Sequence, residues 1–157
     1  MKPASLADIK KELKLRTPEE VLQICLQLGR FKKDNKELLT YLLFDAQDEE
    51  AYIESIKYEI DDLMEEINTS QLYYAKKSLR KILRNLNKYI RYSGDKRTEV
   101  EVRLHFCQAI KYSKIAVHRS AVIENMYKRQ LINIEKALKG LHEDIKADYQ
   151  GLIQSVT

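Results

Sequence analysis

The chain has 157 residues, of which 44% are hydrophobic and 33% are charged, and it contains only four glycines and two prolines. This composition argues against a disordered chain and favours long helices with solvated faces over a protein of strands and turns. No apolar run is long enough to cross a bilayer, and the charged N-terminus lacks the apolar core of a signal peptide. We therefore expect a cytoplasmic protein with no membrane contact.

The net charge of +4 conceals a strong asymmetry along the chain. Residues 1–70 hold 10 basic and 16 acidic residues, a balance of −6, whereas residues 71–157 hold 18 basic and 8 acidic residues, a balance of +10. Segments of opposite charge can pair with each other or attract charged partners.

The first two predicted helices cover residues 5–14 and 17–30. Each begins at a residue suited to capping a helix, Ser5 in the first and Thr17 in the second. Gly29 is expected to end the second helix, because glycine is the residue most often found just beyond a helix C-terminus.

A third helix is predicted over residues 34–46. Its apolar side chains recur at helical spacing, and we expect four leucines to face inward: Leu38, Leu39, Leu42 and Leu43.

Five more helices are predicted over residues 48–67, 70–93, 97–118, 120–140 and 142–156. The sequence EVEVRLHF at residues 99–106 alternates as a strand would. A lone strand would have no second strand to pair with, so we expect a helix there. The connections are a few residues long, which favours antiparallel neighbours.

These elements predict an all-α protein of seven to eight helices that forms a single domain over residues 1–157. The helices 48–67 and 70–93 form one long hairpin, and 97–118 and 120–140 form another. Two such hairpins suggest stacked antiparallel helical pairs in a HEAT-like right-handed superhelix, and a compact helix bundle is the alternative.

The most distinctive segment is the basic stretch at residues 73–97, which carries nine basic residues, one acid and four tyrosines. Its apolar residues recur every three or four positions and predict a buried face: Ala75, Leu79, Ile82, Leu83, Leu86 and Ile90. Three interpretations are open. The basic helix can be charge-matched to the acidic helix 48–67, it can bind nucleic acid, or it can bind an acidic protein.

We take a non-enzymatic interaction module that binds an acidic protein partner as the main functional hypothesis. The expected binding residues are Lys77, Arg80, Lys81, Arg84, Lys88 and Arg91. Nucleic-acid binding through the helix at 73–97 is the alternative, although the chain contains no recognised nucleic-acid motif such as an RNP segment or a GXXG loop. Self-association through apolar helix faces is a further hypothesis.

No motif for catalysis, a cofactor or a metal ion is found. The three histidines lack metal-ligand spacing, and the acids flank apolar stripes instead of interrupting them. Cys25 and Cys107 both lie in apolar helical patterns, which predicts small buried side chains and no disulfide between them.

The pattern TPEEVLQICLQL followed by NKELLTYLLFDA, in the first third of the chain, resembles a family of small uncharacterised bacterial all-helical proteins. The resemblance implies a helical bacterial protein. It assigns no activity and no catalytic or ligand-binding residue.

Overall fold

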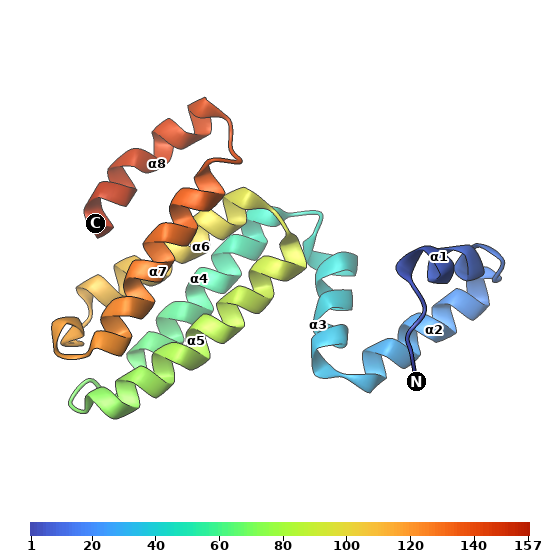
Figure 1. Cartoon of the computed structure of the whole chain (residues 1–157), viewed down its shortest axis with the longest axis horizontal. Helices are drawn as coiled ribbons and strands as arrows, with labels where there is room; N and C mark the ends of the chain where they lie inside the picture. Colours follow the sequence, from blue (N-terminus) through green and yellow to red (C-terminus); the bar gives the residue numbers. More distant parts are fainter. The chain divides into compact units, whose positions relative to one another are not determined.

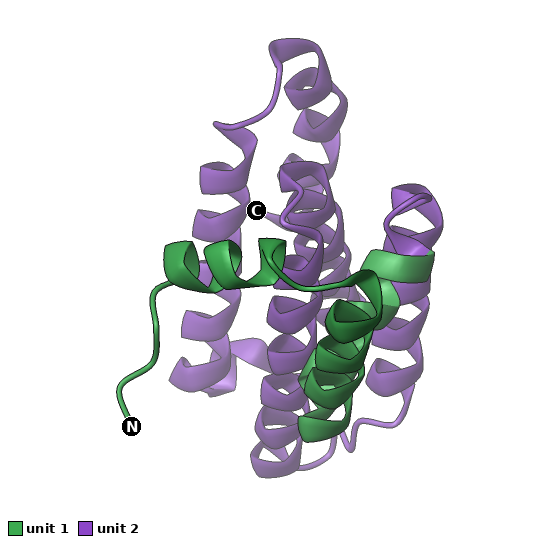
Figure 2. Cartoon of the chain, turned by 90° about the vertical axis from the view of Figure 1, so that its right-hand side faces the viewer, with its two compact units in different colours: residues 1–44 green, residues 45–157 purple.

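The computed structural model describes residues 1–157 and contains eight α-helices and no strand (Figure 1). The all-α prediction of seven to eight helices is confirmed. The chain divides into two compact units, residues 1–44 and residues 45–157 (Figure 2), and each unit is described by itself below. The single domain expected over residues 1–157 stays a prediction.

Unit 1 consists of three helices: α1 (Leu6–Lys14), α2 (Pro18–Phe31) and α3 (Lys33–Thr40). The predicted caps are confirmed. The Ser5 hydroxyl accepts a hydrogen bond from the Asp8 amide at 3.2 Å. Thr17 and Glu20 form a complete capping box, in which each side chain accepts from the backbone amide of the other residue. These caps satisfy amide groups that have no partner inside the helix.

Gly29 does not end α2, so that prediction is wrong. The helix continues through Gly29 to Phe31. A Cβ atom added at Gly29 would lie 3.2 Å from Cδ1 of Leu39 on α3. The glycine therefore permits the close approach of two helices instead of stopping one of them.

The third helix is shorter than predicted and is followed by a π-helical turn at Tyr41–Asp45. Leu42 and Leu43, which were expected to face inward, are 57% and 67% exposed, whereas Tyr41 is only 6% exposed. Each hydrogen bond in a π turn spans one more residue than in an α-helix, so the turn shifts side chains out of the α-helical register on which the prediction rested.

Unit 2 contains five helices: α4 (Glu49–Glu65), α5 (Leu72–Ser93), α6 (Lys96–Tyr112), α7 (Ala121–Leu138) and α8 (Glu143–Val156). A short 3-10 turn at Val117–Arg119 lies between α6 and α7. The α6 helix ends six residues before the predicted boundary at 118. Gly94 ends α5 with a positive φ of 69°, a conformation that favours glycine.

The α6 helix is the centre of unit 2, because it packs against α4, α5, α7 and α8 (Figure 1). Val100, Val102, Leu104 and Phe106 are each at most 2% exposed. Their alternating pattern, which resembled a strand, instead reflects a helix that is covered on several sides. Within unit 2 the helices therefore form a bundle around α6.

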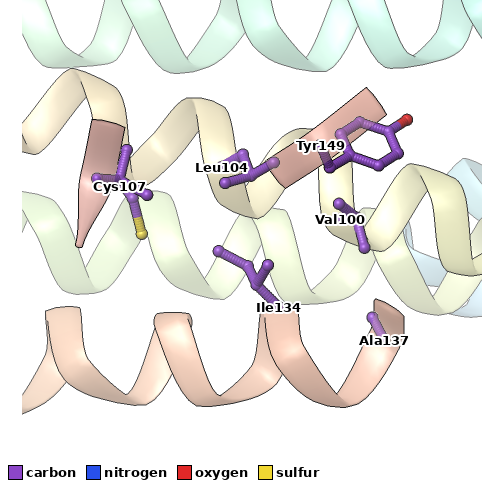
Figure 3. Close-up of a cluster of buried hydrophobic side chains, with 7 residues drawn as sticks. Val100, Leu104, Cys107, Ile134, Ala137 and Tyr149 are labelled. Atoms are coloured by element: carbon purple, nitrogen blue, oxygen red, sulfur yellow. The ribbon is translucent and has the colours of Figure 1, made fainter. Parts of the chain in front are cut away.

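One part of this core is formed by three helices together (Figure 3). Val100 and Leu104 of α6 lie against Ile134 of α7, and Tyr149 of α8 lies beside them. Burying a side chain such as Leu104 or Ile134 stabilises the fold by about 1.5–3 kcal/mol. This core fixes α7 against α6 and so determines where α7 stands relative to α5.

Candidate partner-binding site

The basic helix α5 buries one face and exposes the other. Its buried apolar residues are between 0% and 8% exposed and confirm the predicted stripe: Ala75, Leu79, Ile82, Leu86 and Ile90. Leu83, which was also predicted to belong to the stripe, is half-buried at its edge.

The α4 and α5 helices are neighbours, but the bonds described between them come from uncharged donors. The Tyr52 hydroxyl of α4 donates to the Tyr89 carbonyl oxygen of α5 at 3.2 Å. The Glu59 carboxylate accepts from the Asn85 amide at 3.2 Å and from the Tyr89 hydroxyl at 2.9 Å. The carboxylate of Glu59 is thus satisfied by an amide and a phenol.

Two other acids of α4 pair with α6. Glu50 lies 2.6 Å from the Arg97 guanidinium, and Asp61 lies 2.7 Å from the His105 imidazole. Most of the predicted binding residues on α5 are exposed and form no ion pair: Lys77, Arg80, Lys81, Arg84 and Arg91. The interpretation of α5 as charge-matched to α4 therefore does not hold for these five cations.

Three of the six predicted residues line hollows in the surface, and three do not. Arg84 and Arg91 line one hollow, and Arg80 lines another. Lys77, Lys81 and Lys88 follow each other at intervals of four and seven residues on the outer side of the helix. Lys88 is half-buried, and its ammonium group lies 5.6 Å from the centre of the Tyr89 ring.

The first hollow lies between α5 and the beginning of α6 and has a volume of about 640 Å³. Its lining combines four cations with one acid: Arg84, Arg91, Lys96, Arg103 and Glu99. Asn87, Ile90 and Gly94 complete it.

The second hollow lies between α5 and α7 and has a volume of about 380 Å³. Arg80 and Leu83 of α5 face it from one side. The other side is formed by residues of α7: Val122, Asn125, Met126, Arg129 and Gln130. This hollow combines two guanidinium groups with apolar side chains.

The two hollows adjoin at a hydrogen bond between Arg103 and Gln130. Arg103 lines the first hollow and Gln130 lines the second, and the guanidinium donates to the Gln130 side-chain oxygen at 2.6 Å. Arg103 also donates to the Asn87 side-chain oxygen at 3.1 Å. We call the two neighbouring hollows together the basic groove. Its walls are α5 and α7, and α6 forms its floor in the first hollow through Lys96, Glu99 and Arg103.

The electrostatics of the groove are dominated by positive charge. Glu99 is its one acid, and Lys96 and Arg103 each approach that carboxylate to 3.0 Å. Burial alone would raise the pKa of Glu99, but the hydrogen bond from Lys96 and the charge of Arg103 lower it. The carboxylate is therefore kept ionised and engaged. Four guanidinium groups of the groove are left without an acidic partner: Arg80, Arg84, Arg91 and Arg129.

The prediction missed the α7 wall and the floor of the groove. Val122, Asn125, Met126 and Arg129 recur at spacings of three and four along α7, beside the buried stripe of that helix. This spacing was readable in the sequence, but nothing in the sequence told which face of α7 would stand opposite α5.

Groups suited to other chemistry are sparse. The side chains contain no group of three or more His, Cys, Asp or Glu residues placed to hold a metal ion. His142 caps the beginning of α8. Both cysteines are free thiols, and Cys107 is buried as predicted, whereas Cys25 is half-buried. None of the helices combines the length and the apolar character that a membrane span requires.

Comparison of the chain with protein-family models, with curated proteins and with solved structures gave no match. The basic groove is therefore interpreted from its own residues alone.

Proposed function

We propose that unit 2 is a non-enzymatic binding module that holds an acidic segment of a protein partner in the basic groove. The observation that carries the proposal is the set of four guanidinium groups without an acidic partner: Arg80, Arg84, Arg91 and Arg129. Guanidinium groups bind carboxylates through two parallel hydrogen bonds, so an acidic side chain is their natural ligand.

The apolar part of the groove favours a peptide over a simple anion. Leu83, Val122 and Met126 lie beside the guanidinium groups of the second hollow. An amphipathic helix with leucines on one side and glutamates along its edges would cover these side chains and satisfy the cations together. Such a segment would lie on α6 between α5 and α7.

Nucleic acid is the alternative ligand of the same cations. Stacking of bases on aromatic rings would supply much of the affinity for a single strand. None of the four tyrosines of α5 lines either hollow. The absence of aromatic side chains from both linings favours the protein partner.

The proposal is tested by titrating the protein with fluorescent helical peptides. One peptide carries glutamates and leucines at helical spacing, and its matched control carries glutamines in place of the glutamates. We expect micromolar binding of the acidic peptide at low salt and a loss of at least tenfold for the glutamine peptide. Absence of binding of the acidic peptide at low salt would contradict the proposal.

Two double charge-reversal variants then test whether the peptide binds in the basic groove. Arg80→Glu with Arg84→Glu changes the groove, whereas Lys77→Glu with Lys81→Glu changes the outer side of the same helix by the same net charge. We expect the first pair to abolish peptide binding and the second pair to reduce it by less than about threefold. Equal losses would mean that general attraction, and not the groove, binds the peptide.

Titration with single-stranded RNA and duplex DNA at low and physiological salt tests the alternative hypothesis of nucleic-acid binding. Tight binding of nucleic acid with a steep salt dependence would favour it over the acidic protein partner, because released counterions would then drive association.

A further inference from the structure

Unit 1 exposes far more apolar surface than its size explains. Thirteen of the 21 exposed large apolar side chains belong to its 44 residues. On α2, Leu22, Leu26, Leu28 and Phe31 are 49%, 41%, 51% and 75% exposed. A helix with apolar residues around most of its circumference is normally covered on several sides.

One side of α2 carries a strip of four exposed residues with an ordered pattern of charge. Glu19, Leu22, Leu26 and Arg30 follow each other at spacings of three, four and four, which places them on one side of the helix. The strip therefore reads acid, leucine, leucine, base. Arg30 forms no ion pair within the chain, and Glu19 accepts only a hydrogen bond from Gln23, at 2.9 Å.

We propose that this strip is an interface between two copies of the chain, in which α2 of each copy packs antiparallel against α2 of the other. A two-fold axis through the midpoint between Leu22 and Leu26 places Leu22 of one copy opposite Leu26 of the second. The same axis places Glu19 opposite Arg30. The midpoint of Glu19 and Arg30 differs from that of the leucines by half a residue, about 0.75 Å along the helix.

The strip is complementary to itself in both apolarity and charge, which is the property that a two-fold symmetric interface requires. Unit 2 offers no comparable surface. Its exposed large apolar residues are dispersed over five helices: Tyr58, Tyr73, Tyr74, Tyr112, Val122, Ile132, Ile145 and Leu152. The inference is independent of the basic groove and concerns a different part of the chain.

The experiment measures the mass of the full chain by sedimentation between micromolar and millimolar concentration. We expect a monomer–dimer equilibrium for the natural sequence. Glu19→Lys and Arg30→Glu each place like charges opposite one another twice per dimer, so each should raise the dissociation constant by at least about tenfold. The double variant Glu19→Lys with Arg30→Glu exchanges the two charges and should return the constant to within about threefold of the natural value.

A second set of variants tests the apolar part. Leu22→Asp with Leu26→Asp should give a monomer, whereas Ile132→Asp with Leu152→Asp, which introduces the same charge at exposed sites of α7 and α8, should leave the equilibrium unchanged. Circular dichroism checks that each variant stays helical. A monomer of the natural sequence at millimolar concentration, or a double charge variant that does not recover, would overturn the proposal.

Discussion

The Arg103 guanidinium donates to the side-chain oxygen of Gln130 across the α6–α7 interface, and both residues are almost fully buried. Arg103 also pairs with Glu99 one turn earlier on α6 and donates to Asn87 on α5. One buried cation therefore connects three helices beneath the basic groove. Burying the charge of Arg103 is itself costly, so the residue contributes to stability mainly by supplying hydrogen bonds to the polar groups around it.

Replacing Arg103 by alanine should lower the free energy of unfolding by about 3 kcal/mol, because the buried Gln130 side-chain oxygen would lose its donor and Glu99 would keep only Lys96 as a cationic partner. Arg103→Met, which keeps much of the apolar stem, should cost less. Urea unfolding followed by circular dichroism measures both. A loss below about 1 kcal/mol for the alanine variant would show that water replaces the guanidinium without cost.

The glycines at 94 and 151 allow a matched pair of substitutions. Neither position has any atom within 4 Å of an added Cβ, but only Gly94 has a positive φ, of 69°. Gly94→Ala should destabilise the protein by about 1 kcal/mol because of backbone strain. Gly151→Ala lies inside α8 and should stabilise it by up to about 1 kcal/mol through helix propensity. Thermal unfolding should therefore move in opposite directions for the two variants.

Low pH should destabilise unit 2 because it protonates the carboxylates of Glu99 and Glu101. Burial opposes ionisation of Glu101, but hydrogen bonds from Lys57 and Tyr149 lower its pKa, as Lys96 and Arg103 do for Glu99. Because each folded pKa is depressed, the stability is fully present above the ordinary glutamate pKa of about 4.3 and is lost as the pH falls through the lower folded value. The unfolding free energy should thus decrease below about pH 4.

The variants Glu99→Gln and Glu101→Gln provide the check on this pH dependence. Each should be less stable than the natural sequence at pH 7 and should lose less stability between pH 7 and pH 3. An unchanged acid dependence in both would assign the loss to other carboxylates.

The two thiols should differ in reactivity. Burial raises the pKa of the Cys107 thiol to about 12, so it stays protonated and shielded, whereas Cys25 is half-buried. A thiol reagent should modify one cysteine per chain in native buffer and two in denaturant. The variant Cys25→Ser should abolish the native reaction, and rapid modification of Cys107 would reveal opening of the unit 2 core.

Local signals in the sequence predicted the helices well. The capping residues Ser5 and Thr17 both act as predicted, because a cap depends on residues within one turn. Gly29 was misread, since its role depends on Leu39 of another helix. The local rule for glycine could not anticipate that contact.

The binding site was predicted only in part, because it too depends on contacts between helices. The stripe on α5 correctly separated buried from exposed positions, and so Arg80, Arg84 and Arg91 were found. Arg129 was missed because its place opposite α5 results from the packing of α7 on α6. Periodicity gives the faces of one helix, whereas a groove depends on which faces of two helices meet.

The central position of α6 has a consequence for how unit 2 comes apart. Because α6 packs against four helices, the separation of any one of them exposes part of the α6 surface to solvent. Its backbone amides should be the last in the chain to exchange with deuterium, at rates set by opening of the whole bundle. The floor of the groove would then stay rigid while its walls adjust to whatever lies between them.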